Sequence, residues 1–156
     1  MTSQVYVALR VPANPSRAFA VFTEEIALWW QPSGLFQPTP RGDGRLAFEP
    51  GVDGRLLTTL ANGEEFEIGR ISIWEPGRRL VFTWRPLSFS PDQSTEVEVR
   101  FEAVGDETRI SIKHRAWDTI PQNHVARHGF PEHVTLQHVA DWWRASLTML
   151  RSVFLQ

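Results

Sequence analysis

Residues 96–103 read Glu-Val-Glu-Val-Arg-Phe-Glu-Ala, and this stretch decides the fold. Every even position in it is charged and every odd position is apolar. Successive side chains of a β-strand point to opposite faces, so the alternation predicts a strand with one wet face and one dry face. After a turn at Gly105-Asp106, a second strand is expected over residues 108–116, with its dry positions at Ile110, Ile112 and His114.

Further strands are expected on both sides of this pair. Residues 5–11 carry valine or leucine at every odd position, which predicts a strand with one buried face. Residues 45–84 are expected to form a succession of strands joined by turns at Asp53-Gly54, Asn62-Gly63 and Pro76-Gly77. The Asn62-Gly63 pair predicts a two-residue turn with positive φ at both positions.

The strand that follows Asn62-Gly63 changes its apolar parity. Phe66 and Ile68 share one parity, whereas Ile71 and Ile73 share the other. The change around Gly69 predicts a β-bulge, and a bulge bends the strand that contains it.

Helices are expected near both ends of the chain. Asn14-Pro15-Ser16 predicts the start of a helix that runs through Phe22, because proline is well tolerated at the first helical position. Thr23 is expected to cap a second short helix. The longest helical pattern covers residues 133–155, with an apolar stripe and a second, widening stripe. The second helix carries Ile26, Trp29 and Trp30; the long helix carries Leu136, Val139, Trp143, Leu147, Leu150 and Phe154, with Trp142, Met149 and Val153 in the second stripe.

These elements predict one α+β domain over residues 1–156, with an antiparallel sheet and no internal boundary. The strands have one dry face each, and the C-terminal helix is the only expected element large enough to cover it. A strongly bent sheet wrapped around that helix is expected to leave an apolar cavity between the two.

Composition excludes several classes of function. The formal net charge is -2 and the basic residues are scattered, so no nucleic-acid partner is expected. The chain has no cysteine, which rules out disulfides, thiolate nucleophiles and zinc sites built on sulfur. No stretch approaches the length of apolar sequence that crosses a membrane, so no membrane partner and a cytoplasmic location are expected. Lys113 is the only lysine, an arginine bias typical of GC-rich bacterial genomes.

The aromatic content points to an apolar interior. The sequence has seven tryptophans and ten phenylalanines but one tyrosine. Ligand pockets are commonly walled by such rings, with a few polar groups that orient the ligand. We therefore expect a small hydrophobic or aromatic molecule as partner, in a cavity lined by Trp29, Trp30, Phe48, Phe66, Trp74, Phe82, Trp84, Phe101, Ile112, His114, Trp117, Val139, Trp143 and Leu147.

Several motifs, in order and spacing, resemble the signature of the heat-shock protein 90 ATPase activator-like family. They are Trp29-Trp30-Gln31-Pro32, Gly63-Glu64-Glu65, Gly69-Arg70-Ile71, the run from Trp74 to Trp84, Thr95-Glu96-Val97, Phe101-Glu102 and Glu107-Thr108-Arg109-Ile110.

That family belongs to the START and Bet v-like (SRPBCC) superfamily, so the resemblance implies a helix-grip fold: a curved antiparallel sheet around a long C-terminal helix. Members include ligand binders, polyketide cyclases and aromatases, and a module of a eukaryotic co-chaperone. This chain departs from the common pattern near its end, where Asp141-Trp142-Trp143 stands in place of an earlier Gly-Trp pair, and residues 120–134 form a longer segment than usual.

No metal or other cofactor is expected. His124, His128, His133 and His138 are close in sequence, and the first two have the i, i+4 spacing that can place two ligands on one helix face. Gly129 and Pro131 interrupt such a helix, and no His-Glu-x-x-His pattern is present, so surface and cap positions are the favoured interpretation of these histidines.

His114 leaves two interpretations open. A buried imidazole needs a partner, and a core histidine bonded to a backbone carbonyl is the simpler one. In the other, His114 anchors a ligand or acts as an acid-base group of a cyclase or dehydratase, with a nearby carboxylate or arginine. No catalytic residue is assigned.

Three functions are therefore carried forward. Binding of a small hydrophobic molecule leads, followed by an enzyme that uses His114. A co-chaperone-like interaction module rests on the family resemblance alone. A homodimer is a further expectation, through Trp142 and Met149 if the long helix exposes them.

Overall fold

The computed structural model describes residues 4–30, 45–60, 62–85, 94–116 and 132–155. Its elements are β1 (Val5–Val11), α1 (Pro15–Glu24), α2 (Ile26–Trp29), β2 (Arg45–Phe48), β3 (Arg55–Thr59), β4 (Glu65–Glu75), β5 (Arg79–Trp84), β6 (Thr95–Val104), β7 (Glu107–Arg115) and α3 (Glu132–Phe154).

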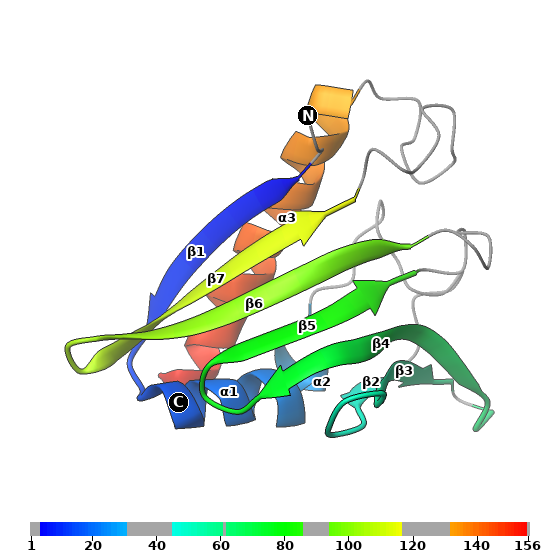
Figure 1. The fold of residues 1–156 in the computed structure, drawn as a ribbon, viewed down its shortest axis with the longest axis horizontal. Coiled ribbons are helices and arrows are strands. Elements are labelled where there is room, and N and C mark those ends of the chain that lie inside the picture. The colour runs from blue at the N-terminus through cyan, green and yellow to red at the C-terminus, as the bar shows by residue number, and fades with distance from the viewer. Residues whose placement is uncertain (1–3, 31–44, 61, 86–93, 117–131, 156) are drawn as a thin grey trace.

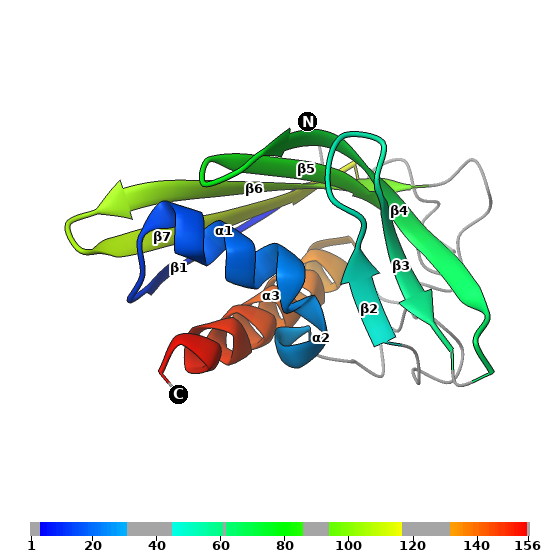
Figure 2. The same cartoon turned by 90° about the horizontal axis from the view of Figure 1, so that it is seen from below.

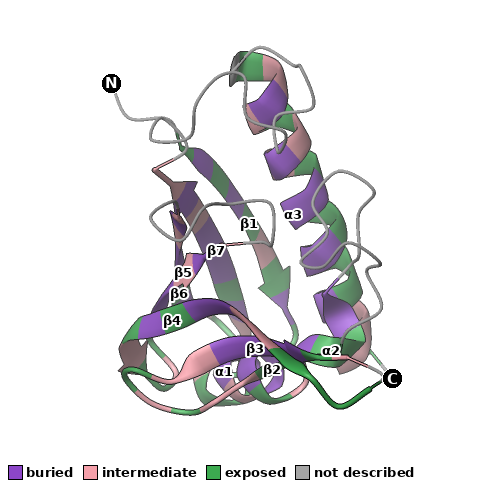
Figure 3. Ribbon diagram, turned by 90° about the vertical axis from the view of Figure 1, so that its right-hand side faces the viewer, coloured by how far each residue is buried: buried purple, intermediate pink, exposed green. Residues whose placement is uncertain are grey.

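The strands form one antiparallel sheet, in the order β1-β7-β6-β5-β4-β3-β2. Consecutive strands from β2 to β7 are neighbours, and β1 joins the far edge by pairing with β7 (Figure 1). Both α1 and α3 lie on the same side of this curved sheet (Figure 2). The buried positions of α3 face the strands, while its exposed positions face away (Figure 3). The predicted helix-grip fold is confirmed.

Two bulges bend β4. The register between β3 and β4 shifts at Leu56/Leu57, opposite Gly69, as the parity change predicts. A Cβ atom at Gly69 would lie 1.7 Å from the carbonyl oxygen of Thr83, so only glycine fits this close approach. The register between β4 and β5 shifts again between Ile71 and Ile73. The second bulge restores the first parity, so Trp74 packs against the core, and Ile73 is half-buried.

The turns and caps follow the sequence only in part. The turn at Asn62-Gly63 exists, but Gly63 has a φ of 87° and Asn62 has no positive φ. The Asn62 side chain instead accepts a hydrogen bond from the Glu64 N–H at 2.9 Å. Asn14 caps α1 by accepting from the Arg17 N–H at 2.8 Å, as predicted. Thr23 caps no helix, because it lies inside α1 and its hydroxyl donates to the Phe19 carbonyl.

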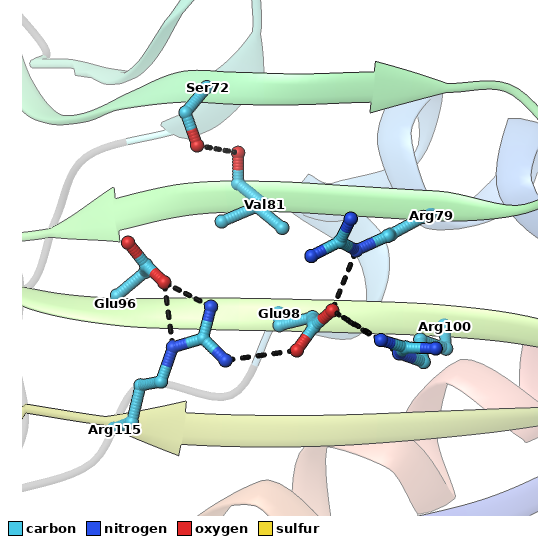
Figure 4. Close-up of polar contacts among 7 residues, drawn as sticks. All are labelled: Ser72, Arg79, Val81, Glu96, Glu98, Arg100 and Arg115. Atoms are coloured by element: carbon cyan, nitrogen blue, oxygen red, sulfur yellow. Dashed lines mark hydrogen bonds and ion pairs between the residues drawn. The ribbon is translucent and has the colours of Figure 1, made fainter.

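The outer face of the sheet carries one buried charge. Val97, Val99 and Phe101 of β6 are buried on the inner face, as their parity predicts. On the outer face Glu98 is only 3 % exposed, although the alternation predicts a wet position. Three arginines cover it, as Figure 4 shows. Glu98 Oε2 accepts from Arg79 Nε at 2.6 Å and from Arg100 at 3.1 Å, and its Oε1 accepts from Arg115 at 3.0 Å.

Candidate ligand-binding interior

Tryptophan rings from α2, β5 and α3 meet in the dry interior. Trp30, at the end of α2, lies 5.1 Å from Trp142 and 5.4 Å from Trp143 between ring centroids, with edge-to-face geometry in both pairs. Trp84 of β5 lies 5.8 Å from Trp142. Such edge-to-face packing is favourable beyond the area that the rings bury. The cluster ties the end of α2 to α3 and to the middle of the sheet.

A second group of aromatic rings packs between α1 and the sheet. Phe19 of α1 packs edge-to-face on Trp74 at 5.1 Å and lies 5.2 Å from Phe101. Phe22 lies 4.6 Å from Trp29, which links this group to the tryptophan cluster. The cavity residues expected from the sequence include none from α1. Phe19 and Phe22 lie on the apolar side of this amphipathic helix, and that pattern could have identified them as interior residues.

His114 joins the inner face of β7 to α3 and β6. The Trp143 indole N–H donates to His114 Nδ1 at 3.0 Å. His114 Nδ1 therefore carries no proton, and the neutral ring has its proton on Nε2. That N–H donates to Thr95 Oγ1 at 2.6 Å, and the Thr95 hydroxyl donates to the Trp84 carbonyl at 3.3 Å. A chain of side-chain bonds, not the single backbone carbonyl of the simpler interpretation, satisfies this imidazole.

Burial sets the protonation state of His114. The side chain is fully buried, and desolvation lowers its pKa to about 3 because the imidazolium would lose its hydration. An acid-base group at neutral pH needs a pKa near the working pH and a nitrogen that can reach the substrate. His114 has neither, since both ring nitrogens already bond to protein groups. The geometry does not favour the interpretation of His114 as an acid-base residue.

The expected cavity residues differ in how far the structure buries them. Phe48, Phe66 and Trp74 are half-buried and pack against the core, and Trp117 lies outside the described residues. The remaining members are buried: Trp29, Trp30, Phe82, Trp84, Phe101, Ile112, His114, Val139, Trp143 and Leu147. Trp142, which the sequence leaves as a candidate for exposure, is 6 % exposed and belongs to the cluster, whereas Met149 is 39 % exposed.

Buried polar atoms without a partner also occur in the interior. Trp30 Nε1, Thr58 Oγ1 and Ser146 Oγ are all shielded from solvent and make no hydrogen bond. Thr58 shares the dry parity of Leu56 on β3, and Ser146 follows Trp142 and Trp143 by about one turn of α3. Neither hydroxyl is among the site residues expected from the sequence. A polar residue on an otherwise apolar face of a strand or helix could have marked both as buried polar groups.

Within the described ranges, no group of three or more histidine, aspartate or glutamate side chains could hold a metal ion. His133 is exposed and His138 is half-buried on α3, while His124 and His128 lie outside those ranges. In the same part of the chain, no helix is long and apolar enough to cross a membrane.

Comparison with known proteins identifies relatives of this fold. The family described as Activator of Hsp90 ATPase homolog 1-like protein matches residues 12–154. Among curated proteins, none matches the sequence. The crystal structure of protein MLL2253 from Mesorhizobium loti is similar, with 15% identity and a TM-score of 0.67, over 97% of this chain and 96% of that one.

Two other solved structures share the fold at similar distance. CalU16 from Micromonospora echinospora has 18% identity and a TM-score of 0.60, over 96% of this chain and 72% of its own. The Aha1 dimer from Colwellia psychrerythraea has 14% identity and a TM-score of 0.63, over 97% of this chain and 95% of its own. At such identities the likeness is one of fold.

Proposed function

The chain belongs to the Activator of Hsp90 ATPase homolog 1-like family, and from this premise we propose that it binds a small hydrophobic or aromatic molecule between α3 and the inner face of the sheet. The observation that carries the proposal is the cluster of Trp30, Trp84, Trp142 and Trp143, drawn from a short helix, a strand and the long helix. Flat apolar rings of this kind make up the walls of many ligand pockets.

The neutral state of His114 supports an uncharged guest. Among the described residues, His114 is the titratable group whose ring contacts Trp84 and Trp143, and burial keeps it neutral. An apolar ligand that enters such surroundings gains from leaving water and faces no unpaired ion. A ligand with a net charge would lose its hydration without a countercharge from His114.

A thermal-shift titration with naphthalene derivatives and with fatty acids tests the proposal. A ligand that binds only the folded state stabilises it by about 2.7 kcal/mol at 100 times its Kd, which for a chain of this size raises Tm by roughly 5 to 10 °C. We expect the uncharged aromatic compounds to give this rise. If no compound raises Tm, the proposal fails.

A control variant separates interior binding from adsorption to the surface. Leu28 and Met149 are 58 % and 39 % exposed, so both offer apolar surface to a probe. The double variant Leu28→Gln, Met149→Gln is expected to show the same ligand-induced rise in Tm as the unaltered chain. Loss of the rise in this variant would mean that the probe binds outside.

The co-chaperone-like function and the expected homodimer rest on fewer observations than ligand binding does. The co-chaperone-like module remains an expectation from the family. The homodimer was expected to form through Trp142 and Met149 of α3, if both were exposed. Trp142 is buried, and of these two side chains Met149 alone is exposed.

A further inference from the structure

The tryptophans of the interior differ in what their indole N–H groups reach. Trp29 Nε1 donates to the Phe22 carbonyl at 3.2 Å, and Trp143 Nε1 donates to His114 Nδ1 at 3.0 Å. Trp30 Nε1 is sealed from solvent and makes no hydrogen bond to the described part of the chain, and Trp30 as a whole is 6 % exposed. Buried indole N–H groups usually find an acceptor, so Trp30 is the exception among these three.

The described surroundings of Trp30 consist of rings rather than hydrogen-bond acceptors. Its neighbours are aromatic rings: Trp29 at 5.8 Å, Trp142 at 5.1 Å and Trp143 at 5.4 Å between ring centroids. The N–H of Trp143 points to His114, and an indole N–H is a donor only. None of these described neighbours offers an acceptor to the Trp30 N–H, so a molecule that enters the interior can supply one.

Water fits this position poorly. A buried water typically makes about three hydrogen bonds, and the described rings around Trp30 offer few polar atoms for them. A carbonyl or ether oxygen on an otherwise apolar molecule is satisfied by that single donor. The local chemistry therefore favours an organic acceptor over a solvent molecule.

We infer that Trp30 Nε1 donates to a carbonyl or ether oxygen of the bound molecule, so that the interior selects an oxygen-bearing aromatic compound over the hydrocarbon of the same shape. This inference rests on the proposed binding function. Thr58 Oγ1 and Ser146 Oγ, from β3 and α3, are further unpartnered polar atoms of the interior.

Isothermal titration with two probes of one shape tests the inference. The probes are 2-acetylnaphthalene and 2-isopropenylnaphthalene, which differ by a carbonyl oxygen in place of a methylene group. We expect the ketone to bind the unaltered chain about tenfold more tightly, equivalent to about 1.4 kcal/mol. In Trp30→Phe, which keeps an aromatic ring but lacks the N–H, that preference should fall to less than about twofold.

Trp29→Phe is the matched control, because it removes the same ring volume beside Trp30 and leaves the Trp30 N–H in place. Because Trp29 is itself an expected cavity residue, the readout is the ratio of the two affinities and not their absolute values, and this ratio should stay near tenfold. Trp29→Phe should also have a lower Tm than Trp30→Phe, because only Trp29 loses an existing bond, that to the Phe22 carbonyl.

An NMR spectrum of the indole N–H groups gives a second readout. The signal absent from Trp30→Phe identifies the Trp30 N–H, and a new hydrogen bond should move it downfield when the ketone is added, but not when the hydrocarbon is added. A preference for the ketone that survives in Trp30→Phe overturns the inference and leaves ligand binding intact. If neither probe binds, the proposed function fails and the inference with it.

Discussion

Two neighbouring rungs of the β6–β7 pair bury a titratable side chain on opposite faces of the sheet. Val97 pairs with His114, and the next rung pairs Glu98 with Lys113. His114 points to the inner face and Glu98 to the outer one, and they are 0% and 3% exposed. The inner group is neutral, whereas the outer group is ionised.

The neighbours account for this difference. For His114, burial lowers the pKa, because the imidazolium would lose its hydration. For Glu98, burial pushes the pKa up, but the hydrogen bond from Arg79, the charge of Arg100 and the bond from Arg115 outweigh it and hold the pKa below its ordinary value of 4.5. Arg115 also bonds to Glu96, which extends the network along β6 (Figure 4).

The comparison teaches where this fold tolerates a buried charge. Arginine side chains can cover a carboxylate with their stems while their charged ends stay partly in water, and Arg79, Arg100 and Arg115 are 32%, 55% and 32% exposed. His114, which faces α3, is 0 % exposed and has no such contact with water. The inner face therefore uses neutral hydrogen bonds, which suits an uncharged guest.

The largest expected effect comes from Glu98→Gln. It removes the one negative charge that three arginines share and leaves their positive charges facing each other on the outer face. Loss of one partner from a buried charge network costs about 3 kcal/mol, less the part that water around the half-exposed arginines restores. We expect the free energy of unfolding in urea to fall by about 2 kcal/mol.

Glu102→Gln is the control for this substitution. Glu102 lies on the same outer face of β6 but is exposed, and the described residues offer it no ion pair. A change within about 0.5 kcal/mol is expected for such a surface position. Equal losses of unfolding free energy in the two variants would show that the buried position of Glu98 does not add to the stability of the fold.

The next effect is a pH dependence that belongs to His114. Its pKa is about 3 in the folded chain against 6.5 in the unfolded one, so between these values the unfolded state binds more protons. Stability must then fall as the pH falls below 6.5, by up to about 1.4 kcal/mol per unit. We expect urea unfolding to show a loss of about 2 kcal/mol from pH 7.5 to pH 5.

His114→Gln should flatten this dependence, because its amide does not titrate. Glu98 cannot produce the same slope, since its protonation in the unfolded chain begins near 4.5 and its stabilisation is lost only as the pH falls further, through its lowered folded pKa. A slope between pH 6.5 and pH 5 that persists in His114→Gln would mean that other groups cause it.

The smallest expected effect concerns two buried threonines. Thr95 bonds to His114 and to the Trp84 carbonyl, whereas the Thr58 hydroxyl has no partner. Thr95→Val leaves the His114 N–H unsatisfied and should cost about 1 to 2 kcal/mol in thermal or urea unfolding. Thr58→Val, the same chemical change at an equally buried strand position, should be neutral or stabilising. Similar losses in both would contradict the bonded chain through His114.

Local patterns predicted the elements well. Strands repeat every two residues and helices every 3.6, so residues close in sequence are enough to reveal each period. This holds for the alternation in residues 5–11 and 96–103 and for the apolar stripe of α3. The bulge at Gly69 was predictable because the apolar parity changes there. The second bulge was not, because Ile71 and Ile73 keep one parity in sequence and only the pairing with Phe82 and Val81 shows the shift.

The alternation of residues along each strand was enough to predict which side chains face the interior, and hence a sheet with a dry face for α3 to cover. The groups that cover the other face, and the partners of the interior polar atoms, depend on contacts between elements that are distant in sequence. The cover of Glu98 comes from Arg79 and Arg115, which lie 19 and 17 positions away in sequence, and the acceptor for Trp143 comes from a different element. Strand periodicity reports the side to which a residue points, whereas its charge state and its hydrogen bonds depend on residues brought near it by the packing of other elements.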